Sequence, residues 1–215
     1  KLRDDQKVVS MAVLDAGERD TEVRDQYLRA AEWKNNDNEP TLDAEKVAEL
    51  AEAEEFILTL TANGYGKISS AYEYRTTGRG GQGLTNIGEP SSNPNRNGHV
   101  VASFPVRHGM QLMLVTDQAK LIRMPLQFRH LIDGGFDSHT GFSISGRGSS
   151  GVRIFNVAKG EQIVKAARID ETEEPENSAE EAVADEIADR GGLDRTTPHT
   201  TFHSDDNIEG EPDSD

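Results

Sequence analysis

The chain has 215 residues, of which 34% are hydrophobic, and it carries a formal net charge of −16 at pH 7. It contains no cysteine, which excludes a disulfide framework and thiolate metal sites. No apolar run approaches the roughly 18 residues that a membrane-spanning helix requires, so no membrane contact is expected.

The charge is distributed unevenly along the chain. Residues 1–55 contain 8 Lys/Arg and 16 Asp/Glu, residues 56–169 contain 13 and 6, and residues 170–215 contain 2 and 17. The three net charges are therefore −8, +7 and −15, which add up to −16. A basic middle between two acidic ends is typical of a polyanion-binding surface with an acidic tail.

The first predicted element is a β-strand over Lys7–Leu14, a short apolar segment. We interpret residues 1–16 as the closing strand of a preceding β unit, and we expect the chain to be a fragment of a longer protein. Residues 17–55 interrupt the strand pattern, because apolar residues such as Val23 and Tyr27 recur there at helical spacing. A charged helical hairpin is predicted, and a partly disordered acidic insertion is the alternative.

Two similar β units follow, over residues 56–106 and 107–169. Two strand-like runs recur in both units. Ile57–Thr61 of the first unit matches Leu112–Thr116 of the second, and His99–Val106 matches Gln162–Ile169. A repeat of about 50 residues, built of short strands and glycine-rich turns, is typical of a propeller blade. The second unit is longer because a loop around Asp133–Asp137 is inserted. Acidic residues, Pro, Ser and Thr dominate residues 170–215, which are predicted to be disordered.

A glycine motif occurs once in each unit, as Gly78-x-Gly80-x-x-Gly83 and as Gly146-x-Gly148-x-x-Gly151. In dinucleotide-binding enzymes this spacing opens a helix whose N-terminus holds a phosphate. Here strand-like segments follow instead, and they are Leu84–Ile87 and Val152–Phe155. A nucleotide-binding enzyme is therefore disfavoured, and tight turns at the edge of each β unit are predicted.

Basic residues accompany this repeat. Arg79 and Arg147 occupy matching positions in the two glycine motifs and are expected to project from equivalent places. Regularly spaced cations on a rigid β scaffold suit the phosphate backbone of DNA. The candidate DNA-binding residues are Lys67, Arg75, Arg79, Lys120, Arg123, Arg147 and Arg153. The alternative for any one of them is an ordinary solvated charge.

No catalytic pattern stands out. His130 and His139 flank Asp133 and Asp137, but we interpret this segment as an inserted loop and not as a metal cluster. No catalytic residue and no metal or cofactor site is therefore predicted. Three aromatic residues are expected to pack and not to stack on bases, and they are Tyr27, Trp33 and Tyr72.

Several motifs closely resemble the C-terminal domain of the DNA gyrase A subunit. They are Asn63–Lys67, Glu73–Arg75, Gly78–Gly83 and Leu112–Gln118. The resemblance covers residues 1–16 and 56–169, and the corresponding domain of the topoisomerase IV A subunit is the near alternative. It implies an all-β fold, a β-pinwheel related to the propeller. In that family its basic rim binds and wraps duplex DNA, in support of ATP-dependent negative supercoiling by the whole enzyme.

The resemblance also implies residue roles and partners. Five of the candidate residues sit in the matching motifs and would contact phosphates, and they are Lys67, Arg75, Arg79, Arg123 and Arg147. The gyrase B subunit and a second A subunit would be partners, and they would bind through parts outside this chain. The protein would act in the cytoplasm, on the chromosome. ATP and Mg²⁺ would belong to other parts of the holoenzyme. The family's catalytic tyrosine is missing, so the chain itself is not expected to cleave DNA.

Two further points concern the family pattern and the tail. The family's seven-residue box, rich in Gln, Arg and Gly, is represented only by a degenerate copy at Thr77–Gly83. The acidic tail, residues 170–215, is either a competitor of DNA for the basic rim or a solubilising segment. A propeller-like protein-interaction module is the alternative for the whole chain. The affinity of such a module for an apolar protein partner would not fall steeply with salt, whereas affinity for DNA would.

Overall fold

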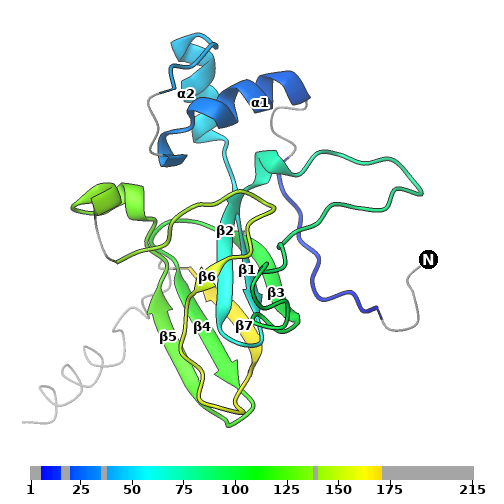
Figure 1. The fold of residues 1–215 in the computed structure, drawn as a ribbon. Helices are drawn as coiled ribbons and strands as arrows, with labels where there is room; N and C mark the ends of the chain where they lie inside the picture. Colours follow the sequence, from blue (N-terminus) through cyan, green and yellow to red (C-terminus); the bar gives the residue numbers. More distant parts are fainter. Residues whose placement is uncertain (1–5, 16–19, 35–37, 138–139, 171–215) are drawn as a thin grey trace, which may run out of the picture. The chain divides into compact units, whose positions relative to one another are not determined.

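The computed structural model describes residues 6–15, 20–34, 38–137 and 140–170. Most of the regular structure in these residues is antiparallel β-sheet, with two α-helices attached to it (Figure 1). The predicted all-β class with a helical insertion is therefore confirmed. Within the described residues, no helix has the length and apolar character to cross a bilayer. The predicted disorder of the acidic tail falls on residues outside the described ranges, apart from Asp170.

The first sheet has four antiparallel strands in the order β3-β1-β2-β6. Their bounds are β1 Phe56–Thr61, β2 Tyr65–Ser70, β3 Val100–Val106 and β6 Val152–Arg153. Leu58 of β1 lies opposite Ile68 of β2 on one side and Phe104 of β3 on the other. The β1–β2 hairpin thus forms the centre of this sheet, and the segment that carries the first glycine motif leaves from the end of β2.

The second sheet has three antiparallel strands in the order β5-β4-β7. Their bounds are β4 Gln111–Thr116, β5 Leu121–Pro125 and β7 Ile163–Ile169. Strand β4 alternates in burial, because Leu112 and Leu114 are buried whereas Met113 and Val115 are half-buried. This period of two is what a strand with one core-facing side requires.

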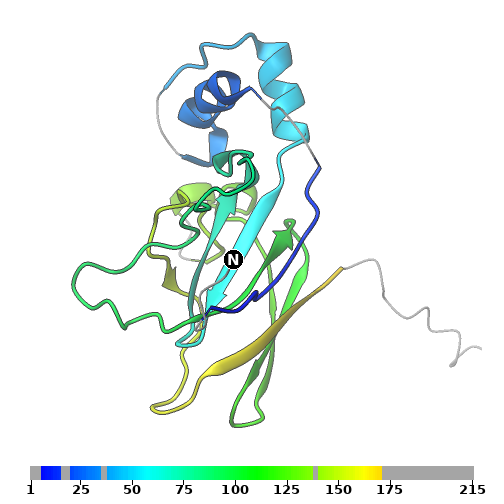
Figure 2. The same ribbon diagram turned by 90° about the vertical axis from the view of Figure 1, so that its right-hand side faces the viewer.

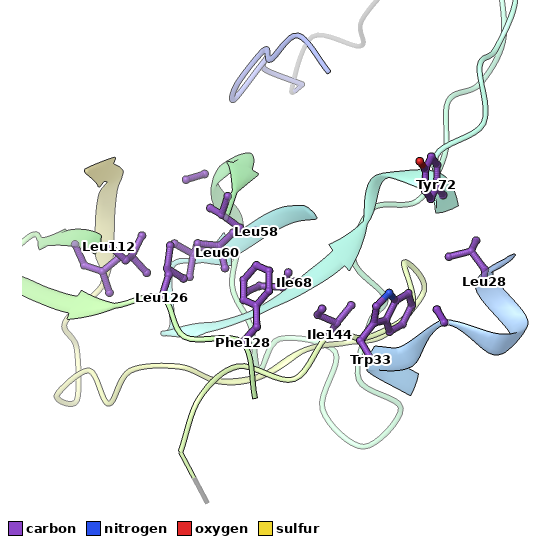
Figure 3. Close-up of a cluster of buried hydrophobic side chains, with 14 of the residues drawn as sticks. Leu28, Trp33, Leu58, Leu60, Ile68, Tyr72, Leu112, Leu126, Phe128 and Ile144 are labelled. Atoms are coloured by element: carbon purple, nitrogen blue, oxygen red, sulfur yellow. The ribbon is translucent and has the colours of Figure 1, made fainter. Parts of the chain in front are cut away.

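The hydrophobic core joins the two sheets (Figure 3). Leu58, Leu60 and Ile68 come from the first sheet and Leu112 and Leu114 from the second, and all five are fully buried. The segment after β5 adds Leu126 and Phe128, and the ring of Phe128 packs edge-on against that of Phe56, 5.0 Å away. Burial of these side chains supplies the rigid scaffold on which the surface residues sit.

The helical insertion consists of α1 (Thr21–Ala30) and α2 (Ala44–Glu52), with a 3₁₀ turn, η1 (Glu32–Lys34), between them. Asp20 and Asp43 cap the two helices, because their carboxylates accept hydrogen bonds from backbone N–H groups of the first turns. Both helices lie at one end of the first sheet (Figure 1, Figure 2). Further 3₁₀ turns are η2 Ala71–Glu73, η3 Arg129–Leu131 and η4 Gly135–Asp137.

Three buried aromatic residues pack at the helical insertion, as the sequence predicts, and one of them, Tyr72, joins the insertion to the β body. The Tyr27 hydroxyl and the Trp33 indole N–H both donate to the Glu54 carboxylate, at 2.8 and 3.1 Å. The Tyr72 hydroxyl, from η2, donates to the carbonyl of Leu50 in α2 at 3.0 Å. Burial of Glu54 raises its carboxyl pKa, although hydrogen bonds from Ser70, Tyr27 and Trp33 to its charged form oppose that shift.

Two predicted strands are not formed. Residues 6–15 have no strand and run beside the first sheet (blue in Figure 2), where the Ser10 hydroxyl donates to the Ser103 carbonyl. Four apolar side chains of this segment are 50–92% exposed, namely Val8, Val9, Met11 and Val13. Apolar composition predicted a strand here, but none of the described strands pairs with this segment, and most of its apolar side chains are exposed. A strand is stabilised by pairing and by burial, and the segment has neither.

Residues 84–87 are the second case. They form a loop, and the Asn86 side chain bonds to the Tyr74 hydroxyl and to the Thr59 hydroxyl. These side-chain bonds tie the segment to β1 without a strand ladder. The prediction was therefore wrong for Leu84–Ile87.

Strand β6 pairs across the predicted boundary between the two β units. Arg153 lies opposite Tyr65, and Val152 opposite Gly66, so β6 completes the first sheet although it belongs to residues 107–169. Ile154 and Phe155 lie beyond β6, and their N–H groups both donate to the Gly64 carbonyl, at 2.9 and 3.0 Å. The two units therefore share a strand, and their assignment as separate blades remains a prediction.

Candidate nucleic-acid interface

Tyr65, the first residue of β2, is a platform for two arginines. The guanidinium of Arg96 lies 4.4 Å from the centre of the ring, and that of Arg153 lies 5.2 Å from it. Arg153 also donates to the Tyr65 hydroxyl at 2.6 Å and remains exposed. Cation–π contact holds both charges in place at the edge of the first sheet.

Arg96 is more than a surface charge, because it also holds the second glycine-rich turn. Its Nη2 atom donates to the carbonyls of Ser150 and Gly151, at 2.9 and 3.0 Å. Arg96 was not among the predicted candidates, and it lies in the loop before β3, within the first β unit. Its position beside Asn97, which also bonds to the Ser150 carbonyl, became apparent only from the fold.

Lys67 is buried, with only 2% of its surface exposed. Its ammonium donates to the Ser69 hydroxyl and to the carbonyls of Gly146 and Arg147, at 2.9, 2.9 and 2.5 Å. Burial lowers the pKa of Lys67 to about 8, and the charge of Glu73 partly opposes that shift. An ammonium that uses its three donors inside the protein is not presented to a phosphate in this conformation. Lys67 positions the second glycine-rich turn.

Arg79 and Arg147 were expected at equivalent places, but the two glycine-rich turns that carry them lie in different environments. Arg79 is exposed, and nothing lies within 4 Å of a Cβ placed on Gly78, Gly80 or Gly83. Arg147 is half-buried, and its backbone N–H donates to the Glu73 carboxylate and its guanidinium to the Thr85 carbonyl. The first turn is open, whereas the second is packed against the first sheet.

Glycine is required at two points of this packing. Gly64 has φ +79°, and a Cβ there would overlap the carbonyl oxygen of Phe155. Gly151 has φ +76°, and a Cβ there would lie 2.6 Å from the carbonyl oxygen of Gly66. Gly64 and Gly151 therefore allow one backbone segment to lie close to another.

Three candidates are exposed and make no hydrogen bond or ion pair with the described residues, and they are Arg75, Arg79 and Arg123. Arg75 follows η2 and lines a cavity together with Arg147. Arg123 lies on β5, opposite Met113, and thus on the second sheet. These three side chains present charge directly to solvent, which is the arrangement that contact with a phosphate backbone requires.

Lys120 lies in the β4–β5 turn and is engaged by a carboxylate. Its ammonium is 2.7 Å from Glu161, which also accepts hydrogen bonds from the Thr116 hydroxyl at 2.7 Å and from the Ala158 N–H at 3.1 Å. The bond from Lys120, followed by that from Thr116, lowers the pKa of Glu161 to about 2. Lys120 is therefore an exposed cation whose charge is largely matched within the fold.

The structure thus divides the seven candidates among several places. Arg153 is at Tyr65, and Arg75 and Arg147 share one cavity. The exposed Arg79 lies in the open first turn, and the buried Lys67 lies beneath the second turn. Lys120 and Arg123 belong to the β4–β5 hairpin of the second sheet. In the described part of the chain, no three His, Asp or Glu residues are grouped so that they could hold a metal ion, and His139 lies outside that part.

Comparisons with known proteins agree in one family. A family model described as DNA gyrase C-terminal domain, beta-propeller, matches residues 55–107 and 139–170. The DNA gyrase A subunit of Rickettsia bellii (strain RML369-C) is 36% identical over 202 residues, covering 89% of this chain and 20% of the relative. The DNA gyrase A subunit of Granulibacter bethesdensis (strain ATCC BAA-1260 / CGDNIH1) is 38% identical over 206 residues, covering 85% and 20%.

Two solved structures show more distant similarity. One is a DNA gyrase A C-terminal domain, which is 20% identical with a TM-score of 0.42 and covers 54% of this chain and 34% of that chain. The other is the C-terminal domain of DNA topoisomerase IV, which is 18% identical with a TM-score of 0.41 and covers 62% and 36%. The chain spans about a fifth of the length of the curated relatives that it matches.

Proposed function

Residues 55–107 and 139–170 belong to the DNA gyrase C-terminal domain family, and on this premise we propose that the chain binds the phosphate backbone of duplex DNA. The observation that carries the proposal is the set of exposed arginines on a rigid β scaffold, in a segment with net charge +7. Arg75, Arg79 and Arg123 make no hydrogen bond or ion pair with the described residues, and Tyr65 holds Arg153 at the sheet edge.

Such contacts bind DNA without reading its sequence. Guanidinium groups at exposed positions contact phosphate oxygens, which fix the protein on the duplex but carry no sequence information. Discrimination between sequences then comes from the energy needed to bend the DNA, and deformable sites are bound more tightly. Lys67 and Arg96 act indirectly, because they hold the second glycine-rich turn in position.

In the whole protein, this domain would wrap DNA and support ATP-dependent negative supercoiling, and its partners would be the gyrase B subunit together with a second A subunit. The protein would then act in the cytoplasm, on the chromosome. ATP and Mg²⁺ would act in parts of the enzyme outside this chain. These statements rest on the names of the curated relatives, which are DNA gyrase A subunits.

The test is the affinity of the full chain for a fluorescently labelled duplex, measured by anisotropy as NaCl is raised from about 50 to about 200 mM. Phosphate binding predicts a steep linear loss of log affinity with log salt, and the loss of each phosphate contact reduces the slope by about 1. Arg79→Gln with Arg123→Gln should therefore lower the slope by about 2. The control is Lys46→Gln, on α2 and paired with Glu49, which should leave the slope unchanged.

A parent chain that is folded but does not bind at low salt contradicts the proposal. That outcome favours the second candidate, a propeller-like protein-interaction module. The observation in favour of such a module is the exposed apolar row of Val8, Met11 and Val13. Binding of an apolar partner there would change little with salt, and so the same titration separates the two candidates.

A further inference from the structure

A cavity of about 460 Å³ opens between helix α1 and the segments that carry the glycine motifs. Its lining contains five cationic side chains, which are Arg24, Arg29, Lys34, Arg75 and Arg147. Two carboxylates, Asp25 and Glu73, also line it, so the net charge is 5 − 2 = +3. The cavity is therefore a concentrated positive site at the junction of the helical insertion and the β body.

The charge of this cavity is opposite to that of the insertion that forms one of its walls. The described residues of the insertion, 20–34 and 38–55, contain four Lys/Arg and eleven Asp/Glu. Three of the four cations line the cavity, whereas only one of the eleven carboxylates, Asp25, does so. An acidic segment thus turns almost all of its positive charge toward one place, which indicates a site for an anion.

Arg24 gives independent evidence for a missing anionic partner. It is only 7% exposed, and its Nε atom has no hydrogen-bond partner among the described residues. Its Nη1 atom lies 3.5 Å from the carbonyl oxygen of Tyr74, which is long for a hydrogen bond. A buried guanidinium N–H without an acceptor is costly, and an anion in the cavity would supply that acceptor.

We propose that this cavity binds a phosphate group of the DNA backbone, so that helix α1 and the turn η1 form part of the DNA-binding surface. The inference rests on the proposed function and names a further site for it. Arg75 and Arg147 belong to the candidate interface and line the cavity as well, which makes the site continuous with that interface. Arg29 and Lys34 are exposed at the same cavity and extend the basic surface onto the insertion.

The test uses the full chain and the double variant Arg29→Gln/Lys34→Gln. Both side chains are exposed, so the fold should persist, and the thermal midpoint checks this. The slope of log affinity against log salt for duplex DNA should fall by about 1–2 relative to the parent, with a loss of affinity of about tenfold at low salt. Lys46→Gln is the matched control, because it removes a cation of the same insertion that does not line the cavity.

The outcomes separate this inference from the proposed function. If the parent binds with a steep salt slope and the double variant matches Lys46→Gln, the cavity is not a DNA site although the chain still binds DNA. If the parent does not bind DNA, both proposals fail. A separate arm adds inorganic phosphate at constant ionic strength. In one outcome, phosphate raises the thermal midpoint of the parent but not of the double variant, while the double variant keeps the parent's salt slope for DNA binding. That result would mean that the cavity binds free phosphate, and it would overturn the DNA assignment.

Discussion

Two ionisable side chains, Lys67 and Glu161, have pKa values well away from the ordinary ones, and both belong to the scaffold. Lys67 is held by the carbonyls of the second glycine-rich turn, and burial lowers its pKa to about 8. Glu161 is 4% exposed and links the β4–β5 turn to the segment before β7 through Thr116 and Lys120. Lys67 thus holds the second glycine-rich turn and Glu161 holds the β4–β5 turn, while the exposed arginines remain available for a ligand.

The Glu161 network predicts a specific pH dependence of stability. The pKa of Glu161 is lowered from 4.5 to about 2 in the folded state, so its contribution to the free energy of unfolding is complete above pH 4.5. That contribution is lost as the pH falls through about 2. Urea unfolding of the parent and of Glu161→Gln should therefore give a difference that is largest at neutral pH and shrinks between pH 4.5 and 2.

The control for this experiment is Glu89→Gln, which removes an exposed carboxylate outside the network and reports the effect of net charge alone. A stability difference for Glu161→Gln that stays constant down to pH 2 would contradict the assigned role.

At the level of elements, β6 is the strand whose place depends most on local backbone geometry. It has only two residues, and it joins β2 where Gly151 and Gly66 come close together. The Gly151→Ala substitution should therefore displace β6, because the new methyl group would lie 2.6 Å from the Gly66 carbonyl oxygen.

A matched control for Gly151→Ala is Gly80→Ala. Both glycines have φ +76°, but nothing lies within 4 Å of a Cβ at Gly80. Gly80→Ala should cost only the left-handed backbone strain, about 1–2 kcal/mol. Gly151→Ala should cost a further 1–3 kcal/mol, roughly the effect of overpacking, when both are measured by urea unfolding. Equal losses for the two variants would show that the close approach of β6 to β2 adds nothing to stability.

At the level of the whole molecule, the acidic tail dominates the net charge. Residues 170–215 carry −15 of the total −16, so residues 1–169 carry −16 + 15 = −1. If the tail competes with DNA for the basic surface, a chain that ends at residue 169 should bind duplex DNA more tightly at low salt. The gain should shrink at about 200 mM NaCl, where salt screens long-range interactions.

A full-length variant in which the Asp and Glu of the tail are replaced by Asn and Gln is the control, because it keeps the length and removes the charge. It should bind as tightly as the shortened chain. Unchanged affinity in both proteins would leave the tail as a solubilising segment.

Local patterns in the sequence determined most of the regular structure. Runs of apolar and β-branched residues predicted β1, β3, β4 and β7, and helical spacing predicted the two helices. These predictions succeed because each of these segments contributes buried apolar side chains to the core, and in β4 their alternation is visible in the residues themselves. The glycine motifs also correctly predicted turns, and the motif residues correctly indicated the family.

Only the tertiary structure decided how the candidate residues are used. Lys67 resembles a surface cation in the sequence, but it lies beneath a turn that begins 79 residues later in the chain. Residues 7–14 are as apolar as a strand, but no strand in the described part of the chain pairs with them. Arg24 on α1 meets Arg75 and Arg147 in one cavity. Burial, pairing and the clustering of charges depend on which distant segments meet, and that information is not contained in any local pattern of residues.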